Sequence, residues 1–516
     1  MRTPIRTLFA LSLLPAVVAA QWDPANGQWG KTDPADLRVM TWNVSDTVCS
    51  SNTKSEGFND WTALAVVIAS IRPDVLVLQE CGDNSGHGSG SGLDSVTNLT
   101  TTLGLLLDGG SDPFQGGAAV TAWVQKYAPG FDLAHVFVST DNDGFNRNVI
   151  LSRFPFVDLN GDTRSTSSDF LLQADKWATT GDGGIRGFGS AEIDLPDATW
   201  AGDVVVGNSH LKSGSSASDK AERIAAAQRI SYYVEHLWNG AGSGLPDPNN
   251  KVIDSPAATT ILAPDTPVIL AGDWNEDEDT NGTKGPAEWL IFAQTQGGTD
   301  GTDRDQSDMA RDNATDPFNG SNDTLGSSKL DYVAWQDSIA TLRRAVVFNT
   351  QTMPAAARPP ELASFPGSAQ LISALASDHR PVFADFILPL AECNDAVDLG
   401  QGKPGTGGLE PRFTVCGTLG TGDTADFSLE DARPLTNCAL VVGLMQINAP
   451  FAGGVLVPAP DVLLFGFATN AGGSLLIPGV PGGGGPFSTF MQWVVFDPGA
   501  SFGKAFSNGL RVDWLP

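Results

Sequence analysis

Positively charged side chains are scarce in this sequence, which holds 30 lysines and arginines against 59 aspartates and glutamates, a formal net charge of -29. A strongly acidic surface repels phosphate backbones at long range, so it argues against a sequence-reading nucleic-acid binder. An enzyme that reaches phosphates through bound cations is still compatible with this charge, because a divalent metal reverses the local field.

Long apolar runs are also missing beyond residue 20, where no stretch approaches the ~20 residues that a membrane-spanning helix needs. Residues 1–20 combine Arg2 and Arg6 with a short apolar core and the small residues Ala19 and Ala20, which is the plan of a secretory signal peptide. An uncleaved anchor is the alternative, but the apolar run is short for a bilayer. We therefore expect a soluble, secreted mature protein, extracellular or periplasmic, with an N-terminal lead-in over residues 21–36.

Cysteine is rare as well. Five cysteines in a secreted chain allow two disulfides and one remaining thiol. Cys49 and Cys81 each follow a predicted strand, so they meet if those strands are neighbours; unpaired buried thiols are the alternative. Cys393, Cys416 and Cys438 form a separate group near the C-terminus, and the sequence leaves its connectivity open.

Several predicted strands are apolar until they end on polar side chains. The clearest runs from Val268 to Ala271, after which Gly272 precedes Asp273 and Asn275. Four apolar residues without polar alternation are typical of a strand with both faces covered. Chemistry collects at the carboxyl ends of such strands, because the backbone there is rigid and the side chains project into a crevice. An acidic turn after a buried strand is the plain alternative.

Two further strands are joined by a helix. Residues 37–43 end on Asn43, residues 74–80 end on Glu80, and residues 61–71 between them have helical apolar spacing. A strand, a helix and a strand within ~40 residues are typical of a βαβ unit in a partly parallel sheet. We therefore expect Asn43 and Glu80 to share one rim.

Later segments extend this pattern. His210 comes near the end of an apolar strand, Asp331 lies in another strand, and the adjacent pair Asp378 and His379 precedes a closing strand. An adjacent acid and histidine can hold a metal, orient an imidazole or exchange protons near neutral pH. Arg147, beside a further strand, is a secondary candidate for binding an anionic group, with a solvated or ion-paired arginine as the alternative.

Together these residues occur in the order and rough spacing of the endonuclease/exonuclease/phosphatase superfamily, the deoxyribonuclease-I-like hydrolases. The chain resembles that family over about residues 37–388 through the motifs WN, QE, HL, GDWN, LDY and SDHRP, with Trp274 standing where phenylalanine is commoner. The resemblance implies a fold of the α/β class, namely a four-layer α/β sandwich in which two packed mixed sheets are flanked by helices. It also implies metal-dependent hydrolysis of a phosphoester.

By similarity, Glu80 would bind the divalent cation, with Asn43 and Asp378 near it, and the cation would be Mg²⁺ or Mn²⁺. The chemistry agrees with this assignment. Pushing hydroxide into an already anionic phosphodiester needs a hard cation on the phosphate oxygens, and carboxylate and amide oxygens are suitable ligands for such a cation.

The same resemblance places Asp273 and Asn275 against the attacking water and the phosphate. His210 and His379 would stabilise the pentavalent transition state or move protons, with Asp331 supporting one of them. Carboxylates and histidines supply both a base and an acid near neutral pH. No Gly-x-Ser-x-Gly elbow accompanies these histidines, so direct attack by water is preferred over a serine or cysteine nucleophile.

The substrate stays open at the level of sequence. The family includes nucleases, sphingomyelinases, inositol-polyphosphate phosphatases and protein toxins, and the segment around Asp331 lacks the Trp-Cys-Asp-Arg signature of the inositol phosphatases. Secretion favours a phosphodiesterase that acts on nucleic acid or on a phospholipid headgroup; sphingomyelinase-like and phosphomonoesterase activities are alternatives. An extracellular binding or adhesion protein with a dead hydrolase domain is the alternative of another class, but none of the matched acids is missing.

A loop after Asn275 fits the twelve-position calcium motif, with Gly282 at the bend. Its oxygen-bearing side chains belong to Asp277, Asp279, Asn281 and Glu288. Lys284 stands where an apolar residue is usual, and no helix is predicted before the loop. Two interpretations therefore stay open, a Ca²⁺ site and an acidic surface loop.

Residues 391–516 differ from the rest of the chain, which at 516 residues is too long for one ordinary core. They hold eleven acidic and five basic residues, a charge of -6, so -23 of the -29 belongs upstream. Strand-like apolar runs alternate with Gly/Pro turns, and helical periodicity is absent, which indicates a smaller all-β sandwich domain. No catalytic cluster occurs in this segment, so we expect a spacer, an anchor or a module that binds a surface or polymer.

Overall fold

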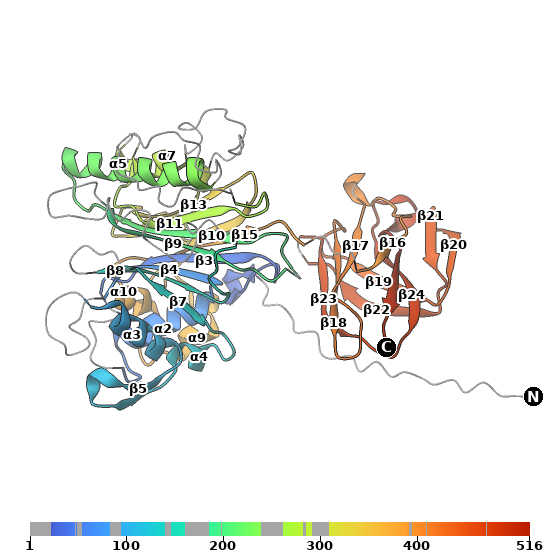
Figure 1. The fold of residues 1–516 in the computed structure, drawn as a ribbon, viewed down its shortest axis with the longest axis horizontal. Helices are drawn as coiled ribbons and strands as arrows, with labels where there is room; N and C mark the ends of the chain where they lie inside the picture. The colour runs from blue at the N-terminus through green and yellow to red at the C-terminus, as the bar shows by residue number, and fades with distance from the viewer. Residues whose placement is uncertain are drawn as a thin grey trace, which may run out of the picture. The chain divides into compact units, whose positions relative to one another are not determined.

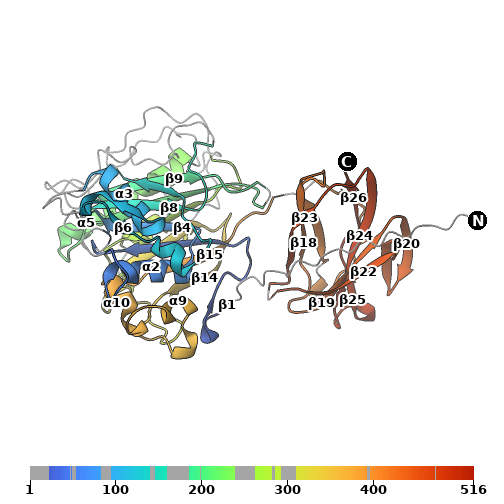
Figure 2. The ribbon, with the colours of Figure 1, turned by 90° about the horizontal axis from the view of Figure 1, so that it is seen from below.

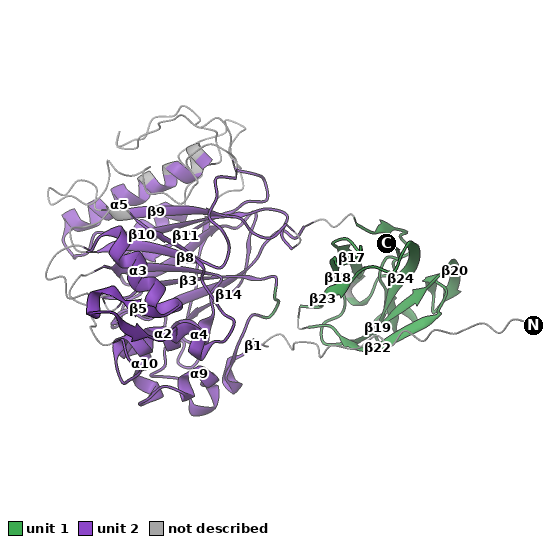
Figure 3. Ribbon diagram, turned by 60° about the horizontal axis from the view of Figure 1, so that its bottom comes forward, with its two compact units in different colours: residues 1–21, 32–34, 392–516 green, residues 22–31, 35–391 purple. Residues whose placement is uncertain are grey.

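The structure is a computed structural model. It describes residues 22–46, 48, 54–82, 94–139, 146–159, 185–197, 199–238, 262–281, 285–291, 309–391, 395–408, 410–470 and 472–516. The expected signal peptide at residues 1–20, and also Cys49 and Cys393, lie outside these residues. The described chain forms two compact units (Figure 3): the N-terminal unit, Trp22–Lys31 with Ala35–Ala391, and the C-terminal unit, Thr32–Pro34 with residues 395–516.

Two mixed sheets pack together in the N-terminal unit. The six-stranded sheet has the order β14-β15-β3-β4-β8-β7, and the five-stranded sheet has the order β12-β13-β11-β10-β9. The pairs β3–β4 and β10–β11 are parallel, and the other neighbours are antiparallel. The strands of the six-stranded sheet are β3 (Leu37–Asn43), β4 (Val75–Cys81), β7 (His135–Val138), β8 (Arg147–Ser152), β14 (Thr341–Val347) and β15 (Val382–Ile387). Those of the five-stranded sheet are β9 (Ile185–Ile193), β10 (Val204–Leu211), β11 (Val268–Asp273), β12 (Met309–Arg311) and β13 (Asp331–Gln336).

Helices cover the outer face of each sheet (Figure 1). The six-stranded sheet packs against α2 (Asp60–Ile71), α3 (Val96–Leu107), α4 (Trp123–Tyr127) and α10 (Ile372–Ala376). The five-stranded sheet packs against α5 (Ala217–Tyr232), which continues as a π-helix over Tyr233–Trp238, and against α7 (Pro286–Ile291). The predicted four-layer α/β sandwich is confirmed.

Smaller elements complete this unit. They are the hairpins β1 (Trp22–Asp23) with β2 (Gln28–Trp29) and β5 (Gly110–Asp112) with β6 (Ala118–Val120), the short helices α6 (Glu278–Asn281) and α9 (Pro360–Ala363), and the 3-10 turns η1 (Pro24–Asn26), η3 (Pro113–Gln115), η6 (Ala355–Ala357) and η7 (Ala369–Leu371). Among the described helices, none combines the length and apolar character needed to cross a bilayer.

Strand β11 shows why its sequence has no polar alternation. Val268 and Leu270 pack under the helices of the outer layer, whereas Ile269 and Ala271 lie in the core between the two sheets. Since successive side chains point to opposite faces of a strand, a strand with both faces covered needs an unbroken apolar run. The covered strand then ends at Asp273, at the edge of the sandwich.

The C-terminal unit is all β. A sheet of order β16-β26-β24-β19-β22, to which β25 adds on β24, faces a three-stranded sheet of order β17-β18-β23, with the hairpin β20–β21 beside them (Figure 2). The strands are β16 (Val397–Asp398), β17 (Arg412–Cys416), β18 (Thr424–Glu430), β19 (Asn437–Gly443), β20 (Gln446–Phe451), β21 (Gly454–Pro458), β22 (Val462–Ala468), β23 (Leu475–Pro481), β24 (Phe487–Phe496), β25 (Lys504–Phe506) and β26 (Leu510–Trp514), with 3-10 turns η8 (Thr406–Gly408) and η9 (Ser501–Gly503). Both sheets contribute to one core, which includes Phe413, Leu429 and Trp493. The all-β prediction is confirmed.

In the N-terminal unit, Cys81 is an unpaired buried thiol, which was one of the two interpretations of the sequence. Cys81 and Cys438 are buried free thiols, so the alternative that paired Cys81 with Cys49 is wrong. Cys81 lies in the interior behind the end of β4, where burial raises its pKa and disfavours the reactive thiolate. Cys416 is disulfide-bonded.

Gly272 allows β11 to approach β10 closely, and this gives a first stability prediction. The residue has a φ of 157°, and a Cβ on it would overlap the carbonyl oxygen of its partner Ser209. We expect Gly272→Ala to lower the free energy of unfolding by about 1–3 kcal/mol, as overpacking does in other cores. Gly104→Ala is the control, because a Cβ there meets nothing within 4 Å in helix α3; it should be neutral or stabilising. Equal urea midpoints for the two variants would contradict this prediction.

Candidate active site

The carboxyl ends of the two parallel strand pairs meet at one rim of the sandwich. Asn43 ends β3 and Asp273 ends β11, so these residues come from different sheets. The side-chain amide of Asn43 nevertheless donates from Nδ2 to Asp273 Oδ2 at 2.9 Å. This contact closes the edge between the sheets and brings the predicted residues of both into one cluster.

Asp273 is the centre of that cluster. Besides Asn43, its Oδ2 atom lies 3.4 Å from His210 Nε2 and 3.8 Å from His379 Nε2. Its other oxygen accepts a hydrogen bond from the backbone N–H of Asn275 at 2.9 Å. Burial and the neighbouring Asp331 carboxylate raise the pKa of Asp273, against the opposing influence of His379 and Asn43. A carboxylate with a raised pKa is better suited to accept a proton near neutral pH than an ordinary one.

Asp331 and His379 form a buried acid–imidazole pair. Asp331 begins β13 and is the antiparallel partner of Asp273, and its Oδ2 lies 2.8 Å from His379 Nδ1. Burial alone would lower the pKa of His379, but the carboxylates of Asp331, Asp273 and Asp378 outweigh it and raise the pKa. These carboxylates therefore favour the imidazolium over the neutral ring, and Nε2 lies on the side of Asp273.

Hydrogen bonds hold the backbone of His379 against the end of β3. Its backbone N–H donates to Ser377 Oγ at 3.0 Å, and Ser377 Oγ in turn donates to the backbone oxygen of Asn43 at 2.7 Å. The indole of Trp42 donates to the His379 carbonyl at 2.9 Å. These bonds attach the segment before β15 to the end of β3, although the two are more than 300 residues apart in sequence.

Glu80 and Asn275 line the same rim. Glu80 has a φ of 55°, its side chain is 26% exposed, and its Oε1 lies 3.7 Å from His210 Nε2. Asn275 also has a left-handed backbone, with a φ of 56°, and its side-chain amide donates to the Leu211 carbonyl at 3.1 Å. Asparagine tolerates this conformation, but glutamate adopts it at a cost, so backbone strain accompanies the site at Glu80.

The donor set fits a hard divalent cation. Potential ligand atoms of Asp273, Asp331 and His379 lie within 4.8 Å of one another, and the two carboxylates are the donors that remain available to a cation when His379 is protonated. Asp331 Oδ1 is buried and has no hydrogen-bond partner among the described residues, and Glu80 adds a partly exposed carboxylate. Uncompensated buried carboxylate oxygens are costly unless a cation or donor meets them, and oxygen ligands suit Mg²⁺ or Mn²⁺.

Not every residue predicted for the site lies in this cluster. The side chain of Asp378 is exposed at the rim and acts on His379 only through its charge. Arg147 is paired with Cys81 in the sheet, but its guanidinium is buried and donates to the carbonyl oxygens of Asp94 and Ser139. Metal binding by Asp378 and anion binding by Arg147 stay predictions.

The predicted calcium loop is only partly within the described residues. Asp277 Oδ1 accepts the backbone N–H of Thr280, Asp279 Oδ2 accepts the side-chain amide of Asn322, and Glu288 lies in α7. Asn281 ends the short helix α6, and residues 282–284 lie outside the described chain. The neighbouring carboxylate of Glu278 accepts hydrogen bonds from the backbone N–H groups of Ala287 and Glu288. The Ca²⁺ proposal stays a prediction.

Three buried polar residues behind the rim were not assigned any role from sequence. Thr41, Gln79 and Asn208 lie between the two sheets and are fully buried. The available signal was a polar side chain that faces the apolar core, such as Asn208, which lies two residues after Val206 in Val204–Leu211.

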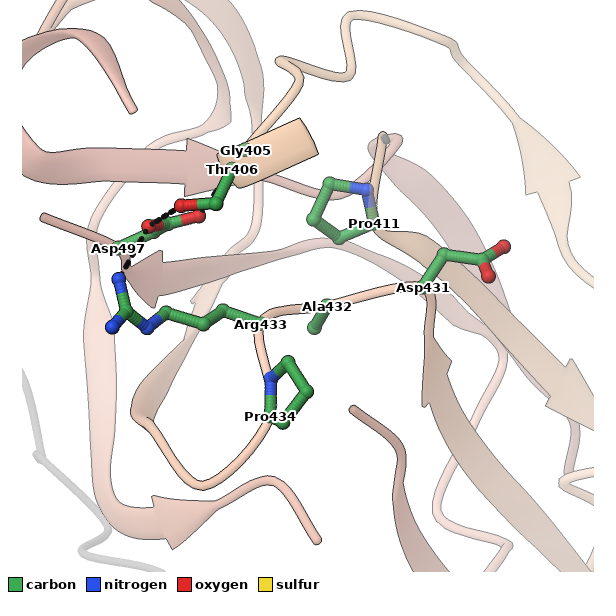
Figure 4. A pocket seen from close by; sticks show the side chains of 8 residues that line it. All are labelled: Gly405, Thr406, Pro411, Asp431, Ala432, Arg433, Pro434 and Asp497. Atoms are coloured by element: carbon green, nitrogen blue, oxygen red, sulfur yellow. Dashed lines mark hydrogen bonds and ion pairs between the residues drawn. The ribbon is translucent and has the colours of Figure 1, made fainter. Parts of the chain in front are cut away.

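The C-terminal unit contains a separate cavity of about 340 Å³ (Figure 4). It is lined by Gly405, Thr406, Pro411, Asp431, Ala432, Arg433, Pro434 and Asp497. Asp497 is buried and accepts hydrogen bonds from Thr406 N at 2.6 Å, from Gly499 N at 2.9 Å and from Arg433 Nη1 at 3.1 Å. The lining contains carboxylates but no histidine, so it does not repeat the cluster at the rim of the N-terminal unit. A binding or anchoring role of the C-terminal unit stays a prediction.

Asp497 gives a pH-dependent stability prediction. Burial alone would raise the pKa of Asp497, but the bonds from Thr406, Gly499 and Arg433 lower it to about 2. Because the pKa in the unfolded chain is about 3.9, the stabilising contribution is complete above that pH and is lost as pH falls towards 2. We expect the melting temperature of the C-terminal unit to drop between these values. Asp497→Asn should be less stable at pH 6 and lose this part of the acid dependence; an unchanged acid profile would contradict the assignment.

Comparisons with known proteins give one family match and several similar solved structures. The model of the family described as "Endonuclease/Exonuclease/phosphatase family" matches residues 40–379. Similar solved structures include an endonuclease/exonuclease/phosphatase from Beutenbergia cavernae DSM 12333, at 18% identity over 92% of this chain and 99% of that chain, with a TM-score of 0.37. A protein titled as a member of the same family from Bacteroides thetaiotaomicron is 15% identical over 69% and 96%, with a TM-score of 0.36. The human Nocturnin catalytic domain with bound sulfate anion is 16% identical over 68% and 93%, with a TM-score of 0.35. The comparison with curated proteins gives no match.

Proposed function

Because the chain belongs to the endonuclease/exonuclease/phosphatase family, we propose that it is a secreted, divalent-metal-dependent phosphodiesterase that attacks its substrate with water. The observation that carries this proposal is the convergence at one rim of side chains from both sheets. They are Asn43, Glu80, His210, Asp273, Asp331 and His379. A carboxylate with a raised pKa, a protonated imidazole and a surplus of oxygen ligands are the groups that hydrolysis of an anionic ester needs.

Asp273 is the proposed general base. Its Oδ2 atom accepts a hydrogen bond from Asn43 Nδ2 and lies 3.4 and 3.8 Å from the Nε2 atoms of His210 and His379, and its Oδ1 accepts from the backbone N–H of Asn275, so the carboxylate is held in one orientation. The raised pKa favours transfer of a proton from water to this oxygen. Asn275, held against Asp273 and Leu211, would present its amide to the phosphate.

His379 and His210 are the proposed groups that meet the developing negative charge. Asp331 binds the opposite nitrogen, Nδ1, and favours the imidazolium, in which Nε2 would also carry a proton. Fixed donors of this kind stabilise transition-state charge without reorganising during the reaction. His210 stands between Glu80 and Asp273, with its Nε2 3.7 Å from Glu80 Oε1 and 3.4 Å from Asp273 Oδ2.

Glu80 and Asn43 are the proposed ligands of Mg²⁺ or Mn²⁺, together with the carboxylates of the Asp273 cluster. The cation would neutralise charge on the phosphate oxygens and lower the pKa of bound water. The partly exposed Glu80 carboxylate supports this role because it is open to solvent beside a buried cluster.

A phosphodiester is the proposed substrate class, in nucleic acid or in a phospholipid headgroup. The absence of the Trp-Cys-Asp-Arg signature around Asp331 supports this choice against inositol polyphosphates. Because the net charge is -29, this protein has few basic side chains with which to bind phosphates directly. Contact with phosphates through a bound cation is therefore the favoured mode.

Hydrolysis of bis-p-nitrophenyl phosphate by the chelator-treated chain tests the proposed function. We expect no turnover in the chelated state and recovery with Mg²⁺ or Mn²⁺, with Ca²⁺ as a third arm. Plasmid DNA, sphingomyelin and p-nitrophenyl phosphate offered in parallel would separate the substrate classes. Turnover that is unaffected by chelation, or no turnover with any of the cations, would contradict the proposal and favour a binding protein with a dead hydrolase domain.

Secretion rests on residues 1–20. The two arginines, the apolar core and the small residues before Gln21 support cleavage between Ala20 and Gln21. Amino-terminal sequencing of the protein from the medium or periplasm of the producing cell should therefore begin at Gln21. Recovery of the intact chain in the cytosol would contradict secretion.

A further inference from the structure

Strand β4 contains an irregularity at the point where it enters the site. β4 and β8 pair regularly up to Leu78 and Val149, and the next pair is Cys81 with Arg147. Gln79 and Glu80 therefore stand opposite a single residue of β8, which is the arrangement of a β-bulge. Glu80 has a left-handed φ of 55°, a conformation that costs a non-glycine residue about 1 kcal/mol or more and that persists only when its surroundings hold it.

Asn208, from the opposite sheet, holds this bulge. Its Nδ2 group donates to the carbonyl oxygens of Leu78 at 2.8 Å and of Val149 at 2.9 Å, the two residues of the last regular pair. Its Oδ1 atom accepts from Gln79 Nε2 at 2.9 Å, and Gln79 Nε2 also reaches Thr41 Oγ1 at 3.1 Å. We call Thr41, Gln79 and Asn208 the inter-sheet clamp.

The clamp joins the two sheets directly behind the catalytic rim. Most of the core between the sheets is apolar, including Val39, Val206 and Ile269, and apolar contacts alone tolerate small sliding movements. A buried and satisfied hydrogen-bond network instead specifies one separation and one register. Both donors and the acceptor of the Asn208 amide are used, so its orientation is fixed.

The position of the clamp links it to two site residues at once. Glu80 directly follows Gln79, and His210 lies two residues after Asn208, on the same face of β10. The 3.7 Å separation of Glu80 Oε1 and His210 Nε2 spans the two sheets, so it depends on how the sheets are held together.

We propose that Asn208 is a positioning residue that orients the Glu80 carboxylate towards the divalent cation and towards His210. This inference rests on the proposed function, because it concerns the site that the proposed function assigns to the cation. Asn208 has no contact with substrate in this role; it acts through the bulge and through Gln79.

Asn208→Leu tests the proposal, since leucine has a similar volume but neither the two donors nor the acceptor. Loss of a residue that orients a metal ligand typically weakens metal affinity or activity about 10- to 100-fold. We expect Mn²⁺ affinity, measured by isothermal titration calorimetry on the chelator-treated full chain, to fall by about this factor. Hydrolysis of bis-p-nitrophenyl phosphate should fall in parallel, and high Mn²⁺ should restore part of the activity.

Gln336→Leu is the matched control. Gln336 is a buried amide in the same sheet, and its Oε1 accepts the backbone N–H of Val268 at 2.8 Å, at the opposite end of β11 from Asp273. This variant should lose stability but keep the Mn²⁺ affinity and turnover of the wild type. Thr41→Val, which removes only the hydroxyl bonded to Gln79, provides a mild second clamp variant if Asn208→Leu does not fold; we expect it to weaken Mn²⁺ binding by a smaller factor.

The outcomes are distinguishable. A wild type that binds no Mn²⁺ and hydrolyses no phosphoester overturns the proposed function and the inference together. An active wild type whose folded Asn208→Leu and Thr41→Val variants keep wild-type Mn²⁺ affinity and turnover overturns the inference alone and leaves Asn208 a structural residue. Equal losses of Mn²⁺ affinity in Gln336→Leu and Asn208→Leu would also overturn it.

Discussion

Asp273→Asn is expected to lower kcat for bis-p-nitrophenyl phosphate by about 10³-fold or more, because it removes a general base that also stands among the metal ligands. Asparagine keeps the size of the side chain, but it has no carboxylate to accept a proton. It also removes a negative charge close to His210 and His379, 3.4 and 3.8 Å from their Nε2 atoms. Steady-state kinetics at saturating Mg²⁺ or Mn²⁺ measures the loss.

The same substitution should not cost stability. The pKa of Asp273 is raised, so the folded state favours the neutral carboxyl, and the stability that this proton provides is lost as pH rises through the folded pKa. Asparagine is neutral at every pH, and the variant should therefore equal or exceed the wild type in melting temperature at neutral and alkaline pH. Loss of function with retained or higher stability is typical of residues that are strained for catalysis.

Asp74→Asn is the matched control for this experiment. Asp74 is a buried carboxylate away from the rim, bonded to Lys31 Nζ at 2.8 Å, Arg153 Nη1 at 2.6 Å and the backbone N–H of Arg38 at 2.8 Å. Its replacement should lower stability while kcat of the folded enzyme is kept. If Asp273→Asn retained more than a tenth of wild-type kcat, Asp273 would not be the general base.

Arg38→Met is expected to cause the largest loss of stability in the N-terminal unit, about 3–5 kcal/mol, as breaking a buried ion pair does elsewhere. Arg38 is 1% exposed and binds Asp385 with two hydrogen bonds, Nε to Oδ1 at 2.6 Å and Nη2 to Oδ2 at 2.8 Å. Its Nη1 donates to the carbonyl oxygens of Trp29 and Ile71 at 2.7 Å each. Methionine would leave the Asp385 carboxylate and two carbonyl groups without these donors.

The double variant Arg38→Met, Asp385→Leu separates two effects of losing Arg38. One is the loss of the partner of the Asp385 carboxylate, and the other is the loss of the hydrogen bonds to the carbonyl groups of Trp29 and Ile71. The apolar pair removes the carboxylate that Arg38→Met leaves with Arg344 alone, so part of the lost stability should return, less the contact of Arg344 Nε with Asp385 Oδ2 at 3.4 Å. Urea unfolding followed by tryptophan fluorescence measures both variants, and the transition of the N-terminal unit is the one to compare, since a chain with two units need not unfold in one step. A single variant that loses less than about 1 kcal/mol, the value of an exposed pair, would contradict the assigned role of Arg38.

Much of the rim was predictable because its residues lie at the ends of apolar strands. The run before Asp273 has no polar alternation, and the structure covers both faces of that strand. The same pattern placed Asn43 and Glu80 on adjacent parallel strands, which the register of β3 with β4 confirms. Local patterns of this kind suffice for strands and their ends.

The contacts between these residues were not predictable from local pattern. Asn43 and Asp273 are 230 residues apart, and Arg38 and Asp385 are 347 residues apart, so only the packing of the two sheets brings them together. The left-handed conformation of Glu80 has no glycine or asparagine to signal it. The role of Asn208 follows from its hydrogen bonds to carbonyl groups of β4 and β8, and these strands belong to the other sheet.

The most direct test of the central claim is the position of Mn²⁺ in a crystal of the full chain, located by anomalous scattering. The account predicts a peak at the rim between the two sheets, with Glu80 and one or more of Asn43, Asp273 and Asp331 as its protein ligands. Strong peaks elsewhere, for example at the loop after Asp277, and none at the rim under conditions that support turnover, would contradict it.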